Sequence, residues 1–195
     1  MARPEIVCRA ASGADENALH HRVRHEVFVL EQEVFATSDV DAHDAGGGTV
    51  KVLGWVAVPG GGWEAGGAVR LYPLEPGIWQ GDRLAVLPAF RAWNLGGHLV
   101  RFAVDTAAQR GGVEMVAHVQ AANVRFFERL GWLRRGGPEV YVGRPHQLMA
   151  IDLTVGSTPA GRGVPSGVDP CQRAQRSVGA TWSRCSERGR GPSKR

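Results

Sequence analysis

The chain has 195 residues and lacks the patterns that mark secreted, membrane-spanning or metal-binding proteins. It contains three cysteines, an odd number, and their positions indicate neither a disulfide framework nor a zinc site. No run of about 18 apolar residues is present to span a membrane, and the N-terminus lacks the basic-then-apolar pattern of a signal peptide. No internal repeat is visible. These absences predict a cytoplasmic protein without a membrane partner.

The composition changes at about residue 155. Residues 156–195 hold eight Lys or Arg against two acidic residues, and they contain 17 Gly, Pro or Ser. Such a segment cannot bury enough apolar surface to offset the entropy of ordering it, so we predict a basic, disordered tail. Residues 1–155 hold 15 basic and 17 acidic residues and are long enough for one core. A solvated tail is favoured over one that binds nucleic acid or an acidic partner by charge.

Hydrophobic periodicity predicts alternating strands and helices in residues 1–155. Apolar residues three or four apart indicate a helix over about 15–34, and further helices are expected at 95–109 and 122–130. Strands are expected at 5–10, 50–58, 68–72, 78–87, 113–119, 139–142 and 147–153. The segment PGGGWEAGG is expected to form a glycine-rich hairpin. This order predicts an α/β fold with a mixed sheet and helices on its faces.

The segment LAVLPAFRAWNLGGHLVRFAVDTA contains a strand, a turn and the start of a helix. The first N–H groups of a helix have no partner within the helix, and together with the helix dipole they attract anions. Gly96 and Gly97 would let a phosphate approach the backbone, and Arg91 could add charge. On the local pattern alone, an ordinary strand–loop–helix remains an equal alternative.

Three segments together resemble the GNAT (GCN5-related) N-acetyltransferase superfamily. The glycine-rich segment is similar to the acetyl-CoA motif R-x-x-G-x-G, with Asn94 in place of the first glycine. VQAANVRFFERLGW resembles the later strand-to-helix element, and VRHEVFVLEQEVFATSDVDAHD resembles the opening of one GNAT branch. The three matches follow one another in the family's order over roughly residues 18–132. The resemblance implies a mixed central sheet that splays around CoA, with helices on both faces.

The resemblance also implies how acetyl-CoA would be held as a co-substrate. Backbone groups of one strand would pair with the pantetheine arm, N–H groups of the turn would hold the pyrophosphate, and a later helix would line the thioester. Trp93 would cover the adenine or ribose, or only pack the turn. The residues implied, in that order, are Leu84, Ala85 and Val86, then Arg91, Ala92, Trp93, Asn94, Leu95, Gly96 and Gly97, and finally Asn123 and Phe127.

Two positions depart from the family pattern. Many members have a tyrosine at the position of Phe127, whose hydroxyl serves the leaving sulfur, and phenylalanine cannot replace it. The change at Asn94 is milder, because asparagine tolerates a positive φ better than most residues and its amide can donate to phosphate. The sequence therefore leaves open a non-catalytic domain that binds CoA as a sensor or partner module.

Direct attack of an amine on the thioester needs a group that accepts the ammonium proton. Asp82 is the first candidate, because it precedes Leu84 by two residues and should share its strand face; the alternative is a solvated carboxylate or one ion-paired with Arg83 or Arg101. Glu31 and Glu33 could serve as base or bind a cationic amine, or could be an exposed helix face. His118 could be a base or a satisfied core histidine.

The expected acceptor is the primary amine of a small molecule, while a peptide acceptor and the acyl chain length stay open. The sequence does not determine the oligomeric state, and a homodimer is compatible with it. A zinc site could be drawn from His21, His25 and the acidic loop that follows. There is no HExxH motif, and the loop does not fit a calcium site, so no metal is expected.

Overall fold

The computed structural model describes residues 3–154, and the predicted tail, 156–195, lies outside the described residues. One sheet of seven strands has the order β1-β2-β3-β4-β5-β7-β6, and only the β4–β5 pair is parallel. The strands are β1 (Ile6–Ala10), β2 (Val50–Ala57), β3 (Trp63–Glu75), β4 (Ile78–Val86), β5 (Glu114–Gln120), β6 (Leu133–Tyr141) and β7 (Arg144–Asp152). The mixed sheet predicted from the sequence is confirmed.

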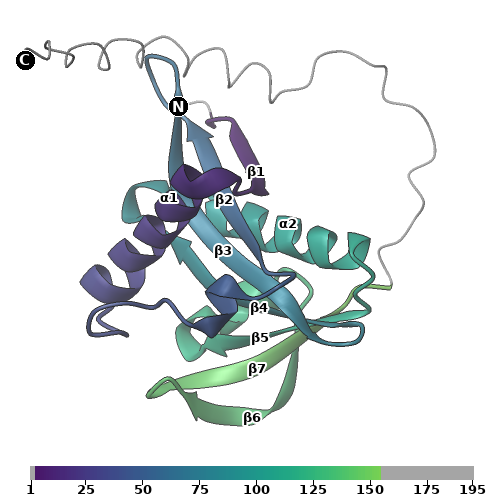
Figure 1. Cartoon of the computed structure of the whole chain (residues 1–195). Helices are drawn as coiled ribbons and strands as arrows, with labels where there is room; N and C mark the ends of the chain where they lie inside the picture. Colours follow the sequence, from purple (N-terminus) through teal and green to yellow (C-terminus); the bar gives the residue numbers. More distant parts are fainter. Residues whose placement is uncertain (1–2, 155–195) are drawn as a thin grey trace, which may run out of the picture. The chain divides into compact units, whose positions relative to one another are not determined.

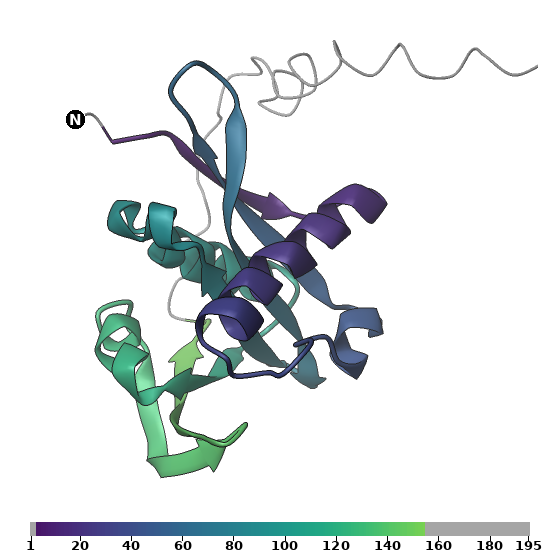
Figure 2. The same cartoon turned by 90° about the vertical axis from the view of Figure 1, so that its left-hand side faces the viewer.

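Helices cover both faces of this sheet, as predicted (Figures 1 and 2). The main helices are α1 (Gly13–His25), α2 (Leu95–Gln109) and α3 (Val124–Glu128). Short helical segments are η1 (Glu26–Glu31), η2 (Ala42–Ala45), η3 (Pro88–Trp93) and η4 (Ala121–Asn123). In Figure 2 the strands run between α1 on one side and α2 and α3 on the other. No helix in residues 3–154 is both long and apolar enough to cross a bilayer.

Each face of the sheet has its own apolar core. The α1 face is built around Val23, Val27, Phe28, Leu53, Ala68 and Ala85. The larger core on the α2 face includes Leu95, Leu99, Val100 and Ala103 from α2 and Met115, Ala117 and Val119 from β5. The alternating burial of β5 follows from the two-residue period of a strand: Met115, Ala117 and Val119 face the α2-side core, and the partly buried residues between them face the other side of the sheet.

The sheet opens between β4 and β5. Their parallel pairing runs only from Ile78 opposite Glu114 to Gln80 opposite Val116. On its other side β4 pairs with β3, and their register shifts. Two residues of β4 lie between Asp82 and Ala85, whereas one residue of β3 lies between Ala68 and Arg70, which pair with them. Arg83, at this bulge, has a φ of 52°. A bulge bends and twists its strand, so it turns the end of β4 away from β5.

Several predicted boundaries need correction. The hairpin turn is confined to residues 58–62, because WEAGG already belongs to β3. The first helix ends in a π-helical segment, η1, in which the Gln32 N–H donates to the Val27 carbonyl. The helix predicted at 122–130 is shorter and begins as a 3₁₀ turn. The predicted helix at 95–109 coincides with α2.

Candidate active site

A cavity of about 120 Å³ lies where β4 and β5 separate. Its wall is formed by residues from both faces of the sheet, together with the end of η1 and the β6–β7 hairpin. The residues that line the cavity include Phe28, Phe35, Val69, Asp82, Arg83, Leu84, Val100, Ala103, Met115, Ala117, His118, Val119, Asn123, Phe127, Trp132 and Tyr141. The predicted residues Asp82, Leu84, Asn123 and Phe127 thus meet at one cavity, although they come from two separate parts of the chain.

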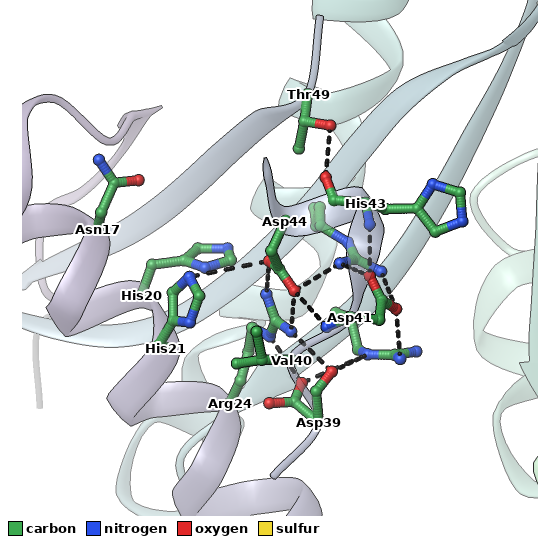
Figure 3. A network of polar contacts seen from close by, with 12 residues as sticks. Asn17, His20, His21, Arg24, Asp39, Val40, Asp41, His43, Asp44 and Thr49 are labelled. Atoms are coloured by element: carbon green, nitrogen blue, oxygen red, sulfur yellow. Dashed lines mark hydrogen bonds and ion pairs between the residues drawn. The ribbon is translucent and has the colours of Figure 1, made fainter. Parts of the chain in front are cut away.

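The acidic loop after η1 is anchored on α1 by a buried arginine (Figure 3). Arg24 is fully buried, and its Nε donates to Asp39 Oδ2 at 2.7 Å while its Nη1 donates to Asp44 Oδ1 at 2.5 Å. Burial alone would raise the pKa of Asp44, but hydrogen bonds from Arg24 and the Asp41 backbone outweigh it and lower the pKa well below its usual range. The loop is therefore held by ionised carboxylates.

A second buried arginine extends this network to the cavity. Arg70 on β3 donates from Nη1 to Asp44 at 2.7 Å and to Asp41 at 2.6 Å, and its Nε and Nη2 donate to the two oxygens of Asp82 at 2.9 and 2.6 Å. Arg83 donates to Asp41 Oδ2 at 3.0 Å and lies 4.9 Å from the ring centre of Phe35. Both oxygens of Asp82 therefore already accept hydrogen bonds from a buried guanidinium.

The prediction that Asp82 and Leu84 share one face of their strand was wrong. The left-handed conformation of Arg83 interrupts the alternation of β4, so a spacing of two residues no longer places Asp82 and Leu84 on a common face. Asp82 is ion-paired, but its main partner is Arg70, at 2.6 Å, which the sequence did not indicate. Of the two predicted partners, Arg83 lies 4.0 Å from Asp82, and no ion pair to Arg101 is present within residues 3–154. The role of Asp82 as base stays a prediction.

The same network uses the carboxylates of the suggested metal site. His21 Nε2 lies 3.8 Å from Asp44 Oδ1, but both oxygens of Asp44 accept hydrogen bonds from arginines. Within residues 3–154 no group of three or more His, Cys, Asp or Glu side chains could hold a metal ion. The acidic loop is thus a structural clamp between α1, β3 and β4.

Glu31 and Glu33 lie outside the wall of this cavity, which takes Val34 and Phe35 from the same segment. Glu31 accepts a hydrogen bond from Arg91 Nη2 at 2.5 Å, and this bond lowers the pKa of the Glu31 carboxyl. Glu33 is exposed and has a φ of 51°. Both carboxylates are therefore exposed outside the cavity, and one is paired with the predicted phosphate turn.

The predicted phosphate turn is a 3₁₀ helix, η3, followed by Asn94 in the left-handed conformation, with φ 57° and ψ 29°. The expectation that asparagine would adopt a positive φ here is confirmed. One part of the prediction needs correction. The N–H of Gly97 donates to the Asn94 carbonyl at 3.0 Å, and that of Asn94 donates to the Arg91 carbonyl at 3.3 Å, so both already have partners within the turn.

Side chains of the turn also have defined positions. Arg91 Nε donates to the Val86 carbonyl at 3.0 Å, so the guanidinium lies against the end of β4. Trp93 packs edge-on against Phe90, with ring centres 5.6 Å apart, which agrees with the packing role. Leu95 is buried in the core and Ala92 is exposed, so only their backbone groups could serve a ligand in the turn.

Glycine at position 96 keeps a gap open beside β4. A Cβ added there would lie 3.6 Å from Val86 Cγ2 and 3.5 Å from Phe126 Cζ, and any longer side chain would project between β4 and α3. Leu84, Ala85 and Val86 lie beyond the last residue of β4 that pairs with β5. Ala85 and Val86 pair with Ala68 and Gly67 of β3 on the other side.

His118 has a more defined setting than a satisfied core histidine. Its Nε2 lies 2.9 Å from Glu139 Oε1, and its ring stacks on Tyr141 with centres 4.3 Å apart. Since the carboxylate accepts, Nε2 carries the proton and Nδ1 carries the lone pair. Nδ1 is buried and has no hydrogen-bond partner among the described residues. The ring of His118, which lines the cavity, is thus oriented by a carboxylate, while its Nδ1 is covered by neighbouring atoms.

Sequence reasoning missed Glu139 and Tyr141. They lie on β6, which is separated from β5 by β7 in the sheet, and β6 is irregular between Arg134 and Pro138. The sequence showed only the alternation of apolar and polar residues around His118. This alternation predicts that the His118 side chain and the core-facing Ala117 side chain point to opposite faces of the sheet. Alternation cannot reveal which residue of another strand reaches the exposed ring.

Phe127 is buried, with 8% of its surface exposed, and packs edge-on against Trp132 and Phe126 at ring-centre distances of 5.3 and 5.5 Å. It lines the cavity beside Asn123, as predicted. The site therefore presents a phenyl ring at this position and no hydroxyl group.

A bulged β4 that separates from β5, with a glycine-containing turn opening a helix beside the gap, is the architecture of acyl-CoA N-acyltransferases. The sequence model of the acetyltransferase (GNAT) family matches residues 30–132, more than half of the chain. The chain belongs to this family. No curated protein matches the sequence.

Solved structures of the same fold cover most of the described chain. A candidate N-acetyltransferase from Lactobacillus plantarum is 25% identical, with a TM-score of 0.65 over 78% of this chain and 99% of that one. ElaA from Escherichia coli is 21% identical, with a TM-score of 0.63 over 75% and 98%. The CoA-dependent acyl-homoserine lactone synthase BjaI, solved with SAM and isopentyl-CoA, is 18% identical, with a TM-score of 0.60 over 89% and 99%.

Proposed function

We propose that this protein is a cytoplasmic N-acyltransferase that moves an acyl group, such as acetyl, from acyl-CoA to the primary amine of a small molecule. The observation that carries the proposal is the cavity at the point where β4 and β5 separate. It is bordered by a segment of β4 whose backbone does not pair with β5 within the described residues. An extended ligand can add to such a segment as an extra strand.

In this proposal the pantetheine arm lies along Leu84 to Val86, and the gap at Gly96 lets it pass toward the turn. The pyrophosphate then lies at the start of α2, where backbone donors and the helix dipole favour an anion. Arg91 must leave the Val86 carbonyl and Glu31 when CoA binds. Its guanidinium would then pair with a phosphate, which is a strong, charge-assisted contact.

We assign the general base to His118, because its ring lines the cavity and its Nε2 is oriented by Glu139. Its Nδ1 has no hydrogen-bond partner among the described residues but is buried, so the ring or its neighbours must move when the substrates bind before Nδ1 can take the proton. The amine nitrogen attacks the thioester carbonyl carbon, an N–C bond forms and the C–S bond breaks. The departing thiolate carries the electron pair, and the ammonium proton passes to Nδ1 directly or through one water. With phenylalanine at position 127, the thiolate leaves as the anion or takes its proton from water.

A small acceptor fits better than a peptide, because the cavity is small and bounded by η1, β4, β5 and the β6–β7 hairpin. The acidic loop adds little attraction for a cationic amine. Three arginines (Arg24, Arg70 and Arg83) pair with the carboxylates of Asp39, Asp41, Asp44 and Asp82, which leaves one net negative charge in the network.

The binding half of the proposal is tested by the thermal stabilisation that acetyl-CoA gives to the full chain. We expect a rise in Tm for the wild type and none for Gly96→Glu, because the glutamate side chain enters the gap and adds negative charge beside the pyrophosphate. Gly137→Glu is a matched control, since a Cβ at Gly137 meets no atom within 4 Å. No shift for the wild type would refute the CoA assignment.

The catalytic half is tested by amine-dependent release of the CoA thiol over a panel of small amines. His118→Gln should lower kcat by 10²–10⁴-fold, the usual contribution of a general base, and should lose the pH dependence of the wild type. Asp82→Asn is the comparison. If Asp82→Asn removes turnover and its pH dependence while His118→Gln does not, the base is Asp82.

The alternative, a CoA-binding sensor without turnover, is favoured by one observation, the buried phenyl ring of Phe127 at the thioester side of the cavity. It predicts tight binding of acyl-CoA and no thiol release with any amine in the panel. Amine-dependent release that His118→Gln abolishes would rule it out.

A further inference from the structure

The cavity at the β4–β5 split connects the two cores of the domain. Two of its lining residues, Phe28 and Phe35, belong to the apolar cluster on the α1 face. Eight others belong to the core on the α2 face: Val69, Val100, Ala103, Met115, Ala117, Val119, Phe127 and Trp132. The cavity therefore passes through the sheet, which is open here because β4 and β5 pair only as far as Gln80 and Val116.

The two ends of the cavity differ in chemistry. The polar and charged lining residues Asp82, Arg83, His118 and Tyr141 lie on the α1 side of the sheet. Asp82 joins the arginine network of α1, Arg83 packs on Phe35, and His118, which stacks on Tyr141, faces away from the α2-side core. The lining contributed by the α2-face core is entirely apolar and buried. An amine acceptor needs the polar end, where its proton can be removed. If the thioester lies where β4 and β5 separate, the alkyl part of its acyl group can extend only into the apolar end.

We propose that the apolar end is an acyl-chain site that selects a saturated chain of about four to six carbons over acetyl. This inference rests on the proposed function. The whole cavity of about 120 Å³ has room for roughly eight to twelve groups of the size of a water or a methylene, at ~10–15 Å³ each for the space open to the centre of such a group. About four of these remain for the acyl chain when the thioester carbonyl and the amine occupy the rest. Acetyl extended by four carbons is hexanoyl.

The residues at this end are suited to such a ligand. Ala103 on α2 and Ala117 on β5 have small side chains, so the space between helix and strand is left open. Met115 lies at the split, and a Cβ added to Gly81 would lie only 2.5 Å from its Cε. Its unbranched side chain can change rotamer at low cost, as methionines do at adaptable binding surfaces.

The test is the affinity of the full chain for CoA, acetyl-CoA, butanoyl-CoA, hexanoyl-CoA and decanoyl-CoA, measured by calorimetry. Burying a methylene tightens binding up to about fourfold. We expect hexanoyl-CoA to bind at least about 30-fold more tightly than acetyl-CoA, with no further gain for decanoyl-CoA.

Ala103→Leu adds three carbons to the wall of the apolar end and should reduce the ratio of acetyl to hexanoyl Kd to below about five. Ala107→Leu is the matched control, because Ala107 lies one turn further along the same buried face of α2 but does not line the cavity. It should keep the ratio of the wild type. If Ala103→Leu does not fold, Met115→Ala is tested in its place. It enlarges the same end of the cavity, so the acyl chain that gives the lowest Kd should lengthen to eight or more carbons.

The outcomes separate this inference from the proposed function. Equal affinity for acetyl-CoA and hexanoyl-CoA, with CoA itself still bound, would overturn the acyl-chain site and leave the N-acyltransferase proposal intact. A chain-length preference that Ala103→Leu and Ala107→Leu reduce equally would also overturn it, since the effect would then be one of general core packing. Failure of every CoA species to bind would refute both.

Discussion

We expect this protein to lose stability between pH 7.5 and pH 5, and we expect that replacing His20 with glutamine removes most of that loss. His20 is a fully buried residue of α1, and its Nε2 lies 3.1 Å from the carbonyl oxygen of Val69. Because a carbonyl only accepts, Nε2 carries the proton of a neutral ring. Val69 lies where the register of β3 and β4 shifts, so the imidazole supports the strand beside the bulge.

Burial lowers the pKa of His20 from 6.5 to about 3, against the opposing effect of the Val69 carbonyl. Between these two values the unfolded chain binds a proton that the folded chain does not, so stability falls as the pH falls below 6.5. Integrated from pH 7.5 to pH 5, the loss is about 2 kcal/mol. The carboxylates of Asp41 and Asp44, whose pKa values are lowered, lose their contribution only below their ordinary values near 4.

The assay is urea unfolding at pH 7.5 and pH 5 for the wild type and His20→Gln, whose amide can keep the hydrogen bond to Val69 without titrating. His21→Gln is the control, because His21 is the neighbouring ring and its pKa is also lowered, although it is only partly buried. We expect the wild type to lose about 2 kcal/mol more than His20→Gln over this pH range. Equal losses for both proteins would refute the assignment of a buried, neutral His20.

Three further predictions concern the network, the thioester side and the turn. Arg70→Met should cost about 3–5 kcal/mol of unfolding free energy, because it removes buried ion pairs to Asp41, Asp44 and Asp82 and leaves Asp82 without a hydrogen-bonding cation; a loss below 1 kcal/mol in urea unfolding would contradict a structural clamp. Phe127→Tyr should raise kcat for thiol release several-fold by supplying an acid beside the leaving sulfur, and an unchanged or lower kcat in a folded variant would show that its hydroxyl does not reach the sulfur. Gly97→Ala should destabilise the native chain, because its Cβ would lie 2.7 Å from Asn94 Oδ1, but should stabilise an Asn94→Gly background by about 0.5–1 kcal/mol. If Gly97→Ala changed the unfolding free energy in the same direction in the wild type and in Asn94→Gly, a clash between its Cβ and Asn94 would not be the cause.

The local pattern was sufficient for the elements that define the family. The apolar period of residues 95–109 predicts α2, and the turn before it tolerates Asn94 because asparagine is stable at positive φ. The ordered set of three segments predicts a splayed sheet with helices on both faces, and the fold agrees. These features depend on neighbours in sequence, whose geometry is set by backbone and side-chain chemistry within a few residues.

The candidate site was predicted only in part. Leu84, Asn123 and Phe127 do line the cavity, but the acidic residues could not be sorted from sequence into free and paired carboxylates. Asp82 is held by Arg70, which is 12 residues away and becomes its neighbour only through the β3–β4 register. The bulge at Arg83 has no glycine to mark it, so the interruption of the strand alternation gave no sequence signal.

The sequence by itself determined the class of fold, the position of the turn at α2 and the absence of a tyrosine hydroxyl at position 127, because each is a property of a local pattern or a single residue. Only the tertiary structure decided which charges neutralise one another, that Glu139 orients His118, and that an apolar cavity crosses the sheet. Those features arise from contacts between strands and helices far apart in the chain. Their geometry depends on register and packing, which one sequence does not encode locally.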